Sequence, residues 1–311
     1  MSVEVAPAVR VGAHAAFDVM TCASVDVVSA ATPRGYFQET RQEYGAQVAG
    51  ELDALTLSAG GTYSRENDYS SVSGSLGASL ALAGKDTTLA ASYAFTDSNV
   101  GRAKDPGFER DLDAHLVTLT ATQTLSAVAI GQLAYTLAAL DGFQSSPYRT
   151  VRVADGTRSP ERTPDERLRH AIVARARLAL TPTWFLSGDY RLYVDSWGIS
   201  AHAVQAGVSH RIAGARWLSI RLRDRVSLQS GASFYRDVYD ERRAFMTADR
   251  ELGGAWSNLV GLKLTARPAL DAAVRLAMDI KLDWMFQRFD DFERRPQRSM
   301  WVVEAGVSAG F

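Results

Sequence analysis

Hydrophobic residues alternate with polar or small residues along many segments of this chain. The last segment, residues 300–311, shows the alternation clearly. One parity carries Trp301, Val303, Ala305, Val307, Ala309 and Phe311, and the other carries Val302, Glu304, Gly306, Ser308 and Gly310. A two-residue period places these sets on opposite faces of a β-strand. An apolar face toward lipid and a small or polar face toward a lumen are typical of a transmembrane β-barrel.

The same alternation predicts about fourteen strands, with 12 or 16 as the alternatives. They cover residues 3–19, 41–52, 55–66, 71–82, 87–96, 112–125, 129–142, 169–180, 184–195, 201–212, 217–229, 256–265, 271–288 and 300–311. Short links follow the even strands, whereas most links after odd strands are long and charged. We therefore expect a transmembrane antiparallel up-and-down β-barrel, all-β, with both termini periplasmic and residues 1–311 as its single domain.

Three loops are expected to be long and exposed, at residues 97–110, 145–168 and 235–251, because they are rich in charges, proline or glycine. The parity of the strand at 112–125 is ambiguous. If the barrel closes, Glu304 of the last strand should meet Arg10, His14 and Asp18 of the first. Charge pairs would then strengthen the seam.

Composition excludes some classes of protein. No run approaches the roughly 18 consecutive apolar residues of a membrane helix, and 34 basic against 35 acidic residues argue against a nucleic-acid-binding protein. Cys22 is the sole cysteine, so it forms no internal disulfide, and we expect no role for it. No signal peptide begins at Met1, although an outer-membrane protein is secreted. We interpret the chain as the mature form.

Charge gathers on the expected lumenal side of the second half. The strand that starts at Trp217 places Arg221, Arg223 and Arg225 on one face as a ladder of three arginines. The expected pore-lining residues are Arg175, Arg177, Asp189, Arg191, Arg211, Arg221, Arg223, Arg225, Lys263, Arg275, Asp279, Lys281, Asp283 and Glu304. Residues 55–96 offer serine, threonine and glycine instead. Such a wall attracts anions, or else its charges pair across strands and rigidify or occlude the interior.

Catalytic and metal sites are weakly indicated. Ser200 and His202 lie two apart near a strand start, with Asp195 upstream, as a minor hydrolase hypothesis. The five histidines lack ligand spacing, so we expect no metal and no cofactor. Four tryptophans near strand ends fit the aromatic girdles of a barrel: Trp184, Trp217, Trp256 and Trp301.

Two segments, ASVDVVSAATP (residues 23–33) and YRLYVDSWGISAH (residues 190–202), resemble an uncharacterised family of Gram-negative outer-membrane β-barrels, a domain of unknown function. The pieces YRTV (148–151), PER (160–162) and PDER (164–167) are similar to the same family. The last strand with its terminal Phe311 also resembles the insertion signal that the barrel-assembly machinery reads. The resemblance implies the bacterial outer membrane and supplies no activity.

These observations lead to three functional hypotheses. The first is a porin-like channel, and not an enzyme, that passes small hydrophilic solutes with a preference for anions. The second is a closed barrel that acts as a membrane anchor or export component, with an envelope protein partner bound to the loops at 145–168 and 235–251. The third is an outer-membrane hydrolase. Outer-membrane lipid and, during insertion, the barrel-assembly machinery are the expected partners in each case.

Overall fold

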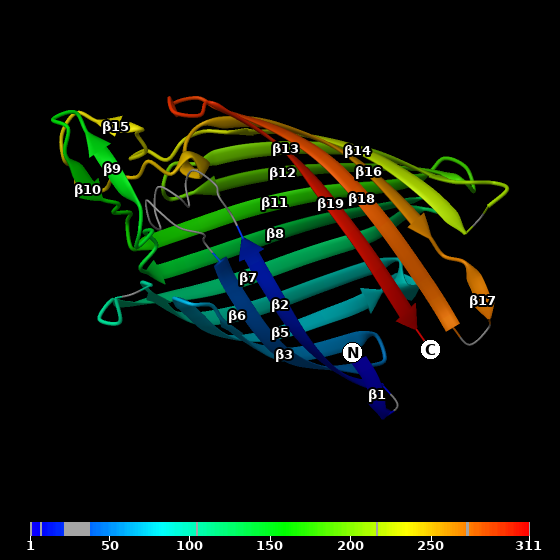
Figure 1. Cartoon of the computed structure of the whole chain (residues 1–311). Coiled ribbons are helices and arrows are strands. Elements are labelled where there is room, and N and C mark those ends of the chain that lie inside the picture. The colour runs from blue at the N-terminus through cyan, green and yellow to red at the C-terminus, as the bar shows by residue number, and fades with distance from the viewer. Residues whose placement is uncertain are drawn as a thin grey trace.

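The chain folds as one large antiparallel sheet that curls into a barrel wall, with a small second sheet at one end (Figure 1). The computed structural model describes residues 2–6, 8–21, 38–103, 105–215, 217–271 and 274–310. The large sheet contains β1 (Ser2–Ala6), β2 (Val9–Thr21), β3 (Gln38–Leu52), β4 (Leu55–Arg65), β5 (Tyr69–Leu82), β6 (Thr87–Gly101), β7 (Glu109–Ser126), β8 (Ala129–Gly142), β11 (Glu166–Ala179), β12 (Trp184–Asp195), β13 (Ser200–Arg211), β14 (Leu218–Gln229), β16 (Ala255–Ala266), β17 (Ala269–Asp271), β18 (Val274–Phe289) and β19 (Gln297–Gly310). The small sheet contains β9 (Thr150–Val153), β10 (Arg158–Pro160) and β15 (Val238–Tyr239), and two 3₁₀ turns are η1 (Ala83–Lys85) and η2 (Arg250–Leu252).

The prediction of an all-β antiparallel barrel is confirmed, with a small difference in strand count. The large sheet has 16 strands. Fourteen of them are long, from 11 residues in β4 to 18 in β7, while β1 and β17 have only 5 and 3 residues. The long strands are the ones that alternation identified. Among the described residues, no helix is long and apolar enough to cross a membrane.

Two boundaries expected from the sequence are wrong. The strand expected at residues 3–19 is split, because the chain reverses at Ala8, whose φ is 70°, and β1 pairs back onto β2. Pro7 has no N–H to donate, so the sequence favours a break there. The loop expected at 97–110 is also shorter, because β6 continues to Gly101 and β7 begins at Glu109.

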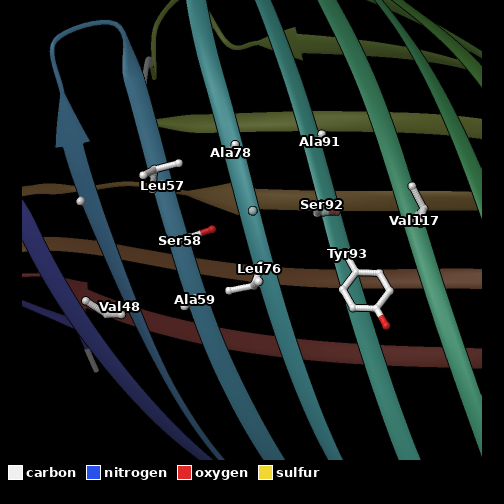
Figure 2. A pocket seen from close by; sticks show the side chains of 12 residues that line it. Val48, Leu57, Ser58, Ala59, Leu76, Ala78, Ala91, Ser92, Tyr93 and Val117 are labelled. Atoms are coloured by element: carbon white, nitrogen blue, oxygen red, sulfur yellow. The ribbon is translucent and has the colours of Figure 1, made fainter.

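The two faces of the large sheet differ in exposure and chemistry. The apolar face carries aliphatic side chains that stand free of other protein atoms, such as Leu76 at 63%, Ile280 at 58% and Val307 at 75% exposure. A surface of this kind across a whole sheet is covered by lipid in an outer-membrane barrel. Figure 2 shows part of this face, where the side chains of Leu57, Leu76 and Val117 lie around Ala78 and Ala91. A groove of 680 Å³ lies here on β3–β7.

The two ends of the barrel also differ. Both chain termini lie at one end, and the small sheet of β9, β10 and β15 lies at the other (Figure 1). The turns at residues 53–54, 83–86, 127–128 and 180–183 link strands at the end that holds the termini. Short turns are periplasmic and long loops external in bacterial barrels. This assigns both termini to the periplasmic side.

The seam between the last and first strands does not have the charge pairs expected of it. Within the described ranges, no backbone pairing joins β19 to β1 or β2. Glu304 contacts Lys281 of β18 at 2.7 Å, while Arg10 and His14 contact Glu51 and Glu43 of β3. The charges at the seam are therefore satisfied by the next strand inward. Cys22 and Phe311 lie outside the described residues.

A row of hydrogen-bonded pairs crosses the apolar face. Three of them join a tyrosine hydroxyl to a histidine Nδ1 on the next strand: Tyr93–His115 at 2.7 Å, and Tyr135–His170 and Tyr190–His202 at 2.8 Å each. Asp224 and Asn258 form the next pair along, at 2.7 Å. Tyr93 of β6 is in register with Val117 of β7, and Val117 is in register with Leu137 of β8. Tyr135 lies two residues from Leu137, so the row shifts by two residues between Tyr93 and Tyr135. Tyr135 is likewise in register, through Ile172 of β11, with Leu192 of β12, which lies two residues from Tyr190.

A constant shift of this kind keeps a row level in a barrel of tilted strands. We call these four pairs the interface belt. Tyrosines with an apolar ring and a polar tip favour the membrane surface. The belt lies toward the external part of the apolar face, with the exposed side chains of Val194 and Leu228 beyond it. At the opposite end of β12, Trp184 stacks on His210 with ring centroids 4.2 Å apart. That the four tryptophans lie in the aromatic girdles of the barrel remains a prediction.

Replacing Tyr135 by phenylalanine should lower the free energy of unfolding by about 1 kcal/mol, because the ring stays but the hydrogen bond to His170 is lost. Denaturant-induced unfolding in lipid vesicles measures this. Replacing Tyr44 by phenylalanine is the matched control, because no histidine in the described part of the chain hydrogen-bonds its hydroxyl and its ring contacts Phe17 instead. An equal effect of both substitutions would contradict a stabilising role for the Tyr–His bond.

Candidate functional site

The opposite, polar face of β11 to β19 is lined by charged residues that the two-residue period places there. Pairing puts Arg175 opposite Asp189, and Arg221 opposite Lys263, which in turn lies opposite Lys281. Thirteen of the fourteen residues expected to line a pore lie on this face of the sheet. The fourteenth, Arg275, belongs to β18, but its side chain lies outside the described part of the structure. Their exposure to a lumen stays a prediction.

Every acid of this set has a basic partner. Asp189 contacts Arg177 at 3.1 Å and Arg175 at 3.5 Å, and it accepts a hydrogen bond from Gln205 at 3.1 Å. Lys263 lies 3.2 Å from Asp279. The carboxylates of the set therefore pair with specific basic side chains, most of them on a neighbouring strand. Charge pairing of this kind was one of the two alternatives for this wall.

The most enclosed of these pairs crosses a whole strand. Asp283 of β18 is 3% exposed and contacts Arg223 of β14 at 2.5 Å and Lys281 at 3.1 Å. Gly261 of β16 lies between the two strands, and a Cβ there would come within 2.1 Å of an Asp283 oxygen. Glycine at this position thus gives the arginine room to reach the aspartate.

Four arginines of the set have no acid partner. Within the described residues, no carboxylate lies within 4.0 Å of the side chains of Arg191, Arg211, Arg221 and Arg225. Arg211 stacks on the ring of Phe185, with its guanidinium carbon 5.5 Å from the centroid. Pairing therefore neutralises only part of the wall, and an excess of positive charge remains.

The same face of β4 to β6 is small and neutral, as expected. Thr56 pairs with Ser79, and Ser58 with Gly77. Ser73 and Thr96 hydrogen-bond each other at 2.9 Å. This side of the wall offers short hydroxyl groups opposite the arginine-rich side.

The external loops are packed together, which corrects the expectation of solvated loops. We call β9, β10, β15, η2 and the loops that join them the cap. Val151, Tyr239 and Met246 form a buried cluster in it. The hydroxyl of Tyr239 accepts a hydrogen bond from the Thr247 N–H at 2.7 Å, and burial raises the pKa of this hydroxyl. The cap thus has a core of its own. Its segments are far apart in sequence and are held together by contacts such as the backbone bridge between Arg162 and Met246.

The cap is fixed to the barrel around one buried carboxylate. The side chain of Asp195 is fully buried and contacts Arg167 at 2.5 Å. It also accepts hydrogen bonds from the Tyr193 hydroxyl at 2.8 Å and from the N–H groups of Trp197 and Ile199 at 3.0 and 2.9 Å. Trp197 and Ile199 then pack with Ala232 and Tyr235 of the next loop. The sequence suggested Asp195 as the acid upstream of Ser200 and His202 and did not predict this role.

The hydrolase arrangement is not assembled. The Ser200 hydroxyl lies 3.3 Å from the Ser230 hydroxyl, while His202 Nδ1 is bonded to Tyr190. Asp195 is occupied by Arg167 and the cap, so it does not orient His202. In the described part of the chain, no three His, Cys, Asp or Glu side chains gather in a metal-binding group.

A family model described as a protein of unknown function, DUF3570, matches residues 13–109 and 102–282. The chain belongs to the DUF3570 family. This confirms the resemblance to an uncharacterised family of outer-membrane β-barrels. No curated protein matches this DUF3570 chain in sequence.

Solved structures with the same fold as this DUF3570 chain are outer-membrane proteins. A bacterial polysaccharide outer membrane secretin is 9% identical with a TM-score of 0.56, covering 97% of this chain and 85% of its own. A BenF-like porin from Pseudomonas fluorescens is 12% identical with a TM-score of 0.50, covering 97% and 74%. The siderophore receptor PirA from Pseudomonas aeruginosa is 10% identical with a TM-score of 0.55, and this chain covers 56% of it. At these identities the likeness establishes the barrel fold alone.

Proposed function

We propose that this DUF3570 protein is a porin-like channel, and not an enzyme, that conducts small hydrophilic solutes across the bacterial outer membrane with a preference for anions. The arginine excess on the polar face carries the proposal. Among the described residues, four arginines without acid partners keep a net positive charge on the wall after each acid of the expected pore-lining set has been paired. A low-dielectric barrel strengthens the attraction of such fixed charges for anions.

Ion selectivity in a planar bilayer tests the proposal. Replacing both Arg221 and Arg225 by glutamine removes two unpaired charges. It should move the reversal potential toward zero and lower the anion-to-cation permeability ratio by about twofold or more. Circular dichroism should confirm that the variant keeps its β-sheet content.

The chain offers a neutral control. Replacing Arg223 by glutamine together with Asp283 by asparagine removes one positive and one negative charge that already cancel. This double variant should keep the permeability ratio of the native protein. Absence of channel openings from pure native protein, or equal ratios for all three proteins, would rule out an anion channel built on these arginines.

A closed barrel that anchors or exports through an envelope protein partner is the second candidate. The cap supports it, because the buried cluster of Val151, Tyr239 and Met246 gives the external end a fixed surface of the kind a partner binds. Electrically silent protein that co-purifies with one envelope partner, and loses it when the loop at 235–251 is replaced by a glycine and serine linker, would favour this candidate.

Membrane insertion completes the proposal. The aliphatic face contacts outer-membrane lipid, and the terminal Phe311 is proposed as the signal that the barrel-assembly machinery reads. We propose that residues 1–311 form one barrel domain.

A further inference from the structure

A pocket lies between the cap and the polar face, at the external end of the barrel. It has a volume of 320 Å³ and is lined by Arg191, Arg225 and Gln287 from the strands and by Leu252 of η2. The η2 turn is held over it because Gln229 donates hydrogen bonds to the carbonyl groups of Glu251 and Gly253, at 2.9 and 3.0 Å. The pocket is therefore built from both the wall and the cap.

The charges around the pocket leave two arginines uncompensated. Arg167 is paired with Asp195, and Glu251 with Arg298 at 3.0 Å. Arg191 and Arg225 remain without a carboxylate among the described residues. An arginine with no acid partner in a half-enclosed site favours an incoming anion, because its planar guanidinium matches carboxylate and phosphate oxygens.

The strand between the two arginines leaves them room to act together. Arg191 of β12 is in register with Ala203 of β13, and Ala203 with Ser227 of β14, two residues from Arg225. Ala203 presents only a methyl group on this face, and Gln205, which is in register with Arg225, donates to Asp189. Gln287 adds a neutral donor, since its carbonyl oxygen accepts from Arg298 Nε at 2.9 Å and no partner of its amide nitrogen is found among the described residues.

We infer that this pocket is a binding site for a small organic dianion, a dicarboxylate or a phosphate ester. Two arginines balance two negative charges, and 320 Å³ accommodates a ligand of about ten non-hydrogen atoms. This inference deepens the proposed function by naming a solute class and a place where it binds before entering the barrel.

Calorimetric titration of the detergent-solubilised full-length protein tests the site without any need for conduction. Succinate and glycerol phosphate are the probes, and glycerol is the neutral control ligand. Both dianions should bind, and glycerol should not. Replacing either Arg191 or Arg225 by glutamine should weaken binding by about tenfold. Heat-modifiable gel mobility verifies that each variant is folded.

Arg211→Gln is the matched control variant, because Arg211 is also an unpaired arginine of the polar face but does not line the pocket. Binding should change less than twofold in it. Equal weakening by Arg211→Gln, or no binding of either dianion to native protein, would overturn the site. Anion selectivity retained in that case would leave the channel proposal standing, whereas specific binding with silent bilayers would support the site and reject the channel.

Discussion

Replacing Asp195 by alanine is expected to destabilise the protein by about 3 to 5 kcal/mol, the largest effect of any single substitution proposed for it. The side chain of Asp195 is fully buried, and that of Arg167 is 8% exposed. Without the carboxylate, the Arg167 guanidinium is left in a buried position with no counter-charge. The N–H groups of Trp197 and Ile199 lose their acceptor at the same time.

Unfolding in guanidinium chloride, followed by tryptophan fluorescence in lipid vesicles, measures this loss. Asp195→Asn should fall between alanine and the native residue, because an amide oxygen still accepts from the two backbone N–H groups while the charge is gone. Asp155→Ala in an exposed loop is the control and should change stability by less than 1 kcal/mol. A native-like midpoint for Asp195→Ala would show that the cap is not anchored through this carboxylate.

The strands of this protein were predictable because each one is a local pattern. Leu222 and Arg223 are neighbours in sequence and lie on opposite faces, so a two-residue period identifies both the strand and its faces. The period fails where the chain reverses without a long loop, as at Ala8 between β1 and β2. It also left open the parity of residues 112–125, which the pairing of Thr118 with Thr136 now fixes.

The cap and the interface belt were not predictable, because they depend on contacts between distant segments. Val151 and Met246 lie among charged and loop-forming residues, and nothing local marks them as parts of one cluster. Tyr135 and His170 are 35 residues apart and meet only once β8 and β11 are aligned. Sequence alone could list the five histidines as scattered. It could not supply the register that pairs three of them with tyrosines.

The candidate site was predictable in its residue types and not in its pairing. The two-residue period placed Arg221, Arg223 and Arg225 on one face and gave no reason to distinguish their charge partners. In the structure, Arg223 is neutralised by Asp283, and the other two have no acid partner among the described residues. This difference arises because Gly261 opens a path across β16 at one position of the ladder alone. The functional experiment therefore targets Arg221 and Arg225 and uses Arg223 as a control.

Replacing Asp283 by alanine should change stability and selectivity in opposite directions. Asp283 is 3% exposed and is shared by Arg223 and Lys281, whose side chains are 26% and 23% exposed. Its removal leaves Arg223 without a counter-charge and should cost about 3 kcal/mol of unfolding free energy. Lys281 keeps Glu304 at 2.7 Å as a partner, which limits the loss.

The same substitution adds one uncompensated positive charge to the wall, so the anion-to-cation permeability ratio should rise above that of the native channel. Adding Arg223→Gln to Asp283→Ala should reverse both changes, because the half-buried guanidinium and the extra charge disappear together. Unfolding in vesicles and reversal potentials, measured on the native protein, on the Asp283→Ala and Arg223→Gln single variants and on the double variant, complete this double-mutant cycle. A stability loss with no rise in anion preference would mean that the pair supports the wall without facing the path of the ions.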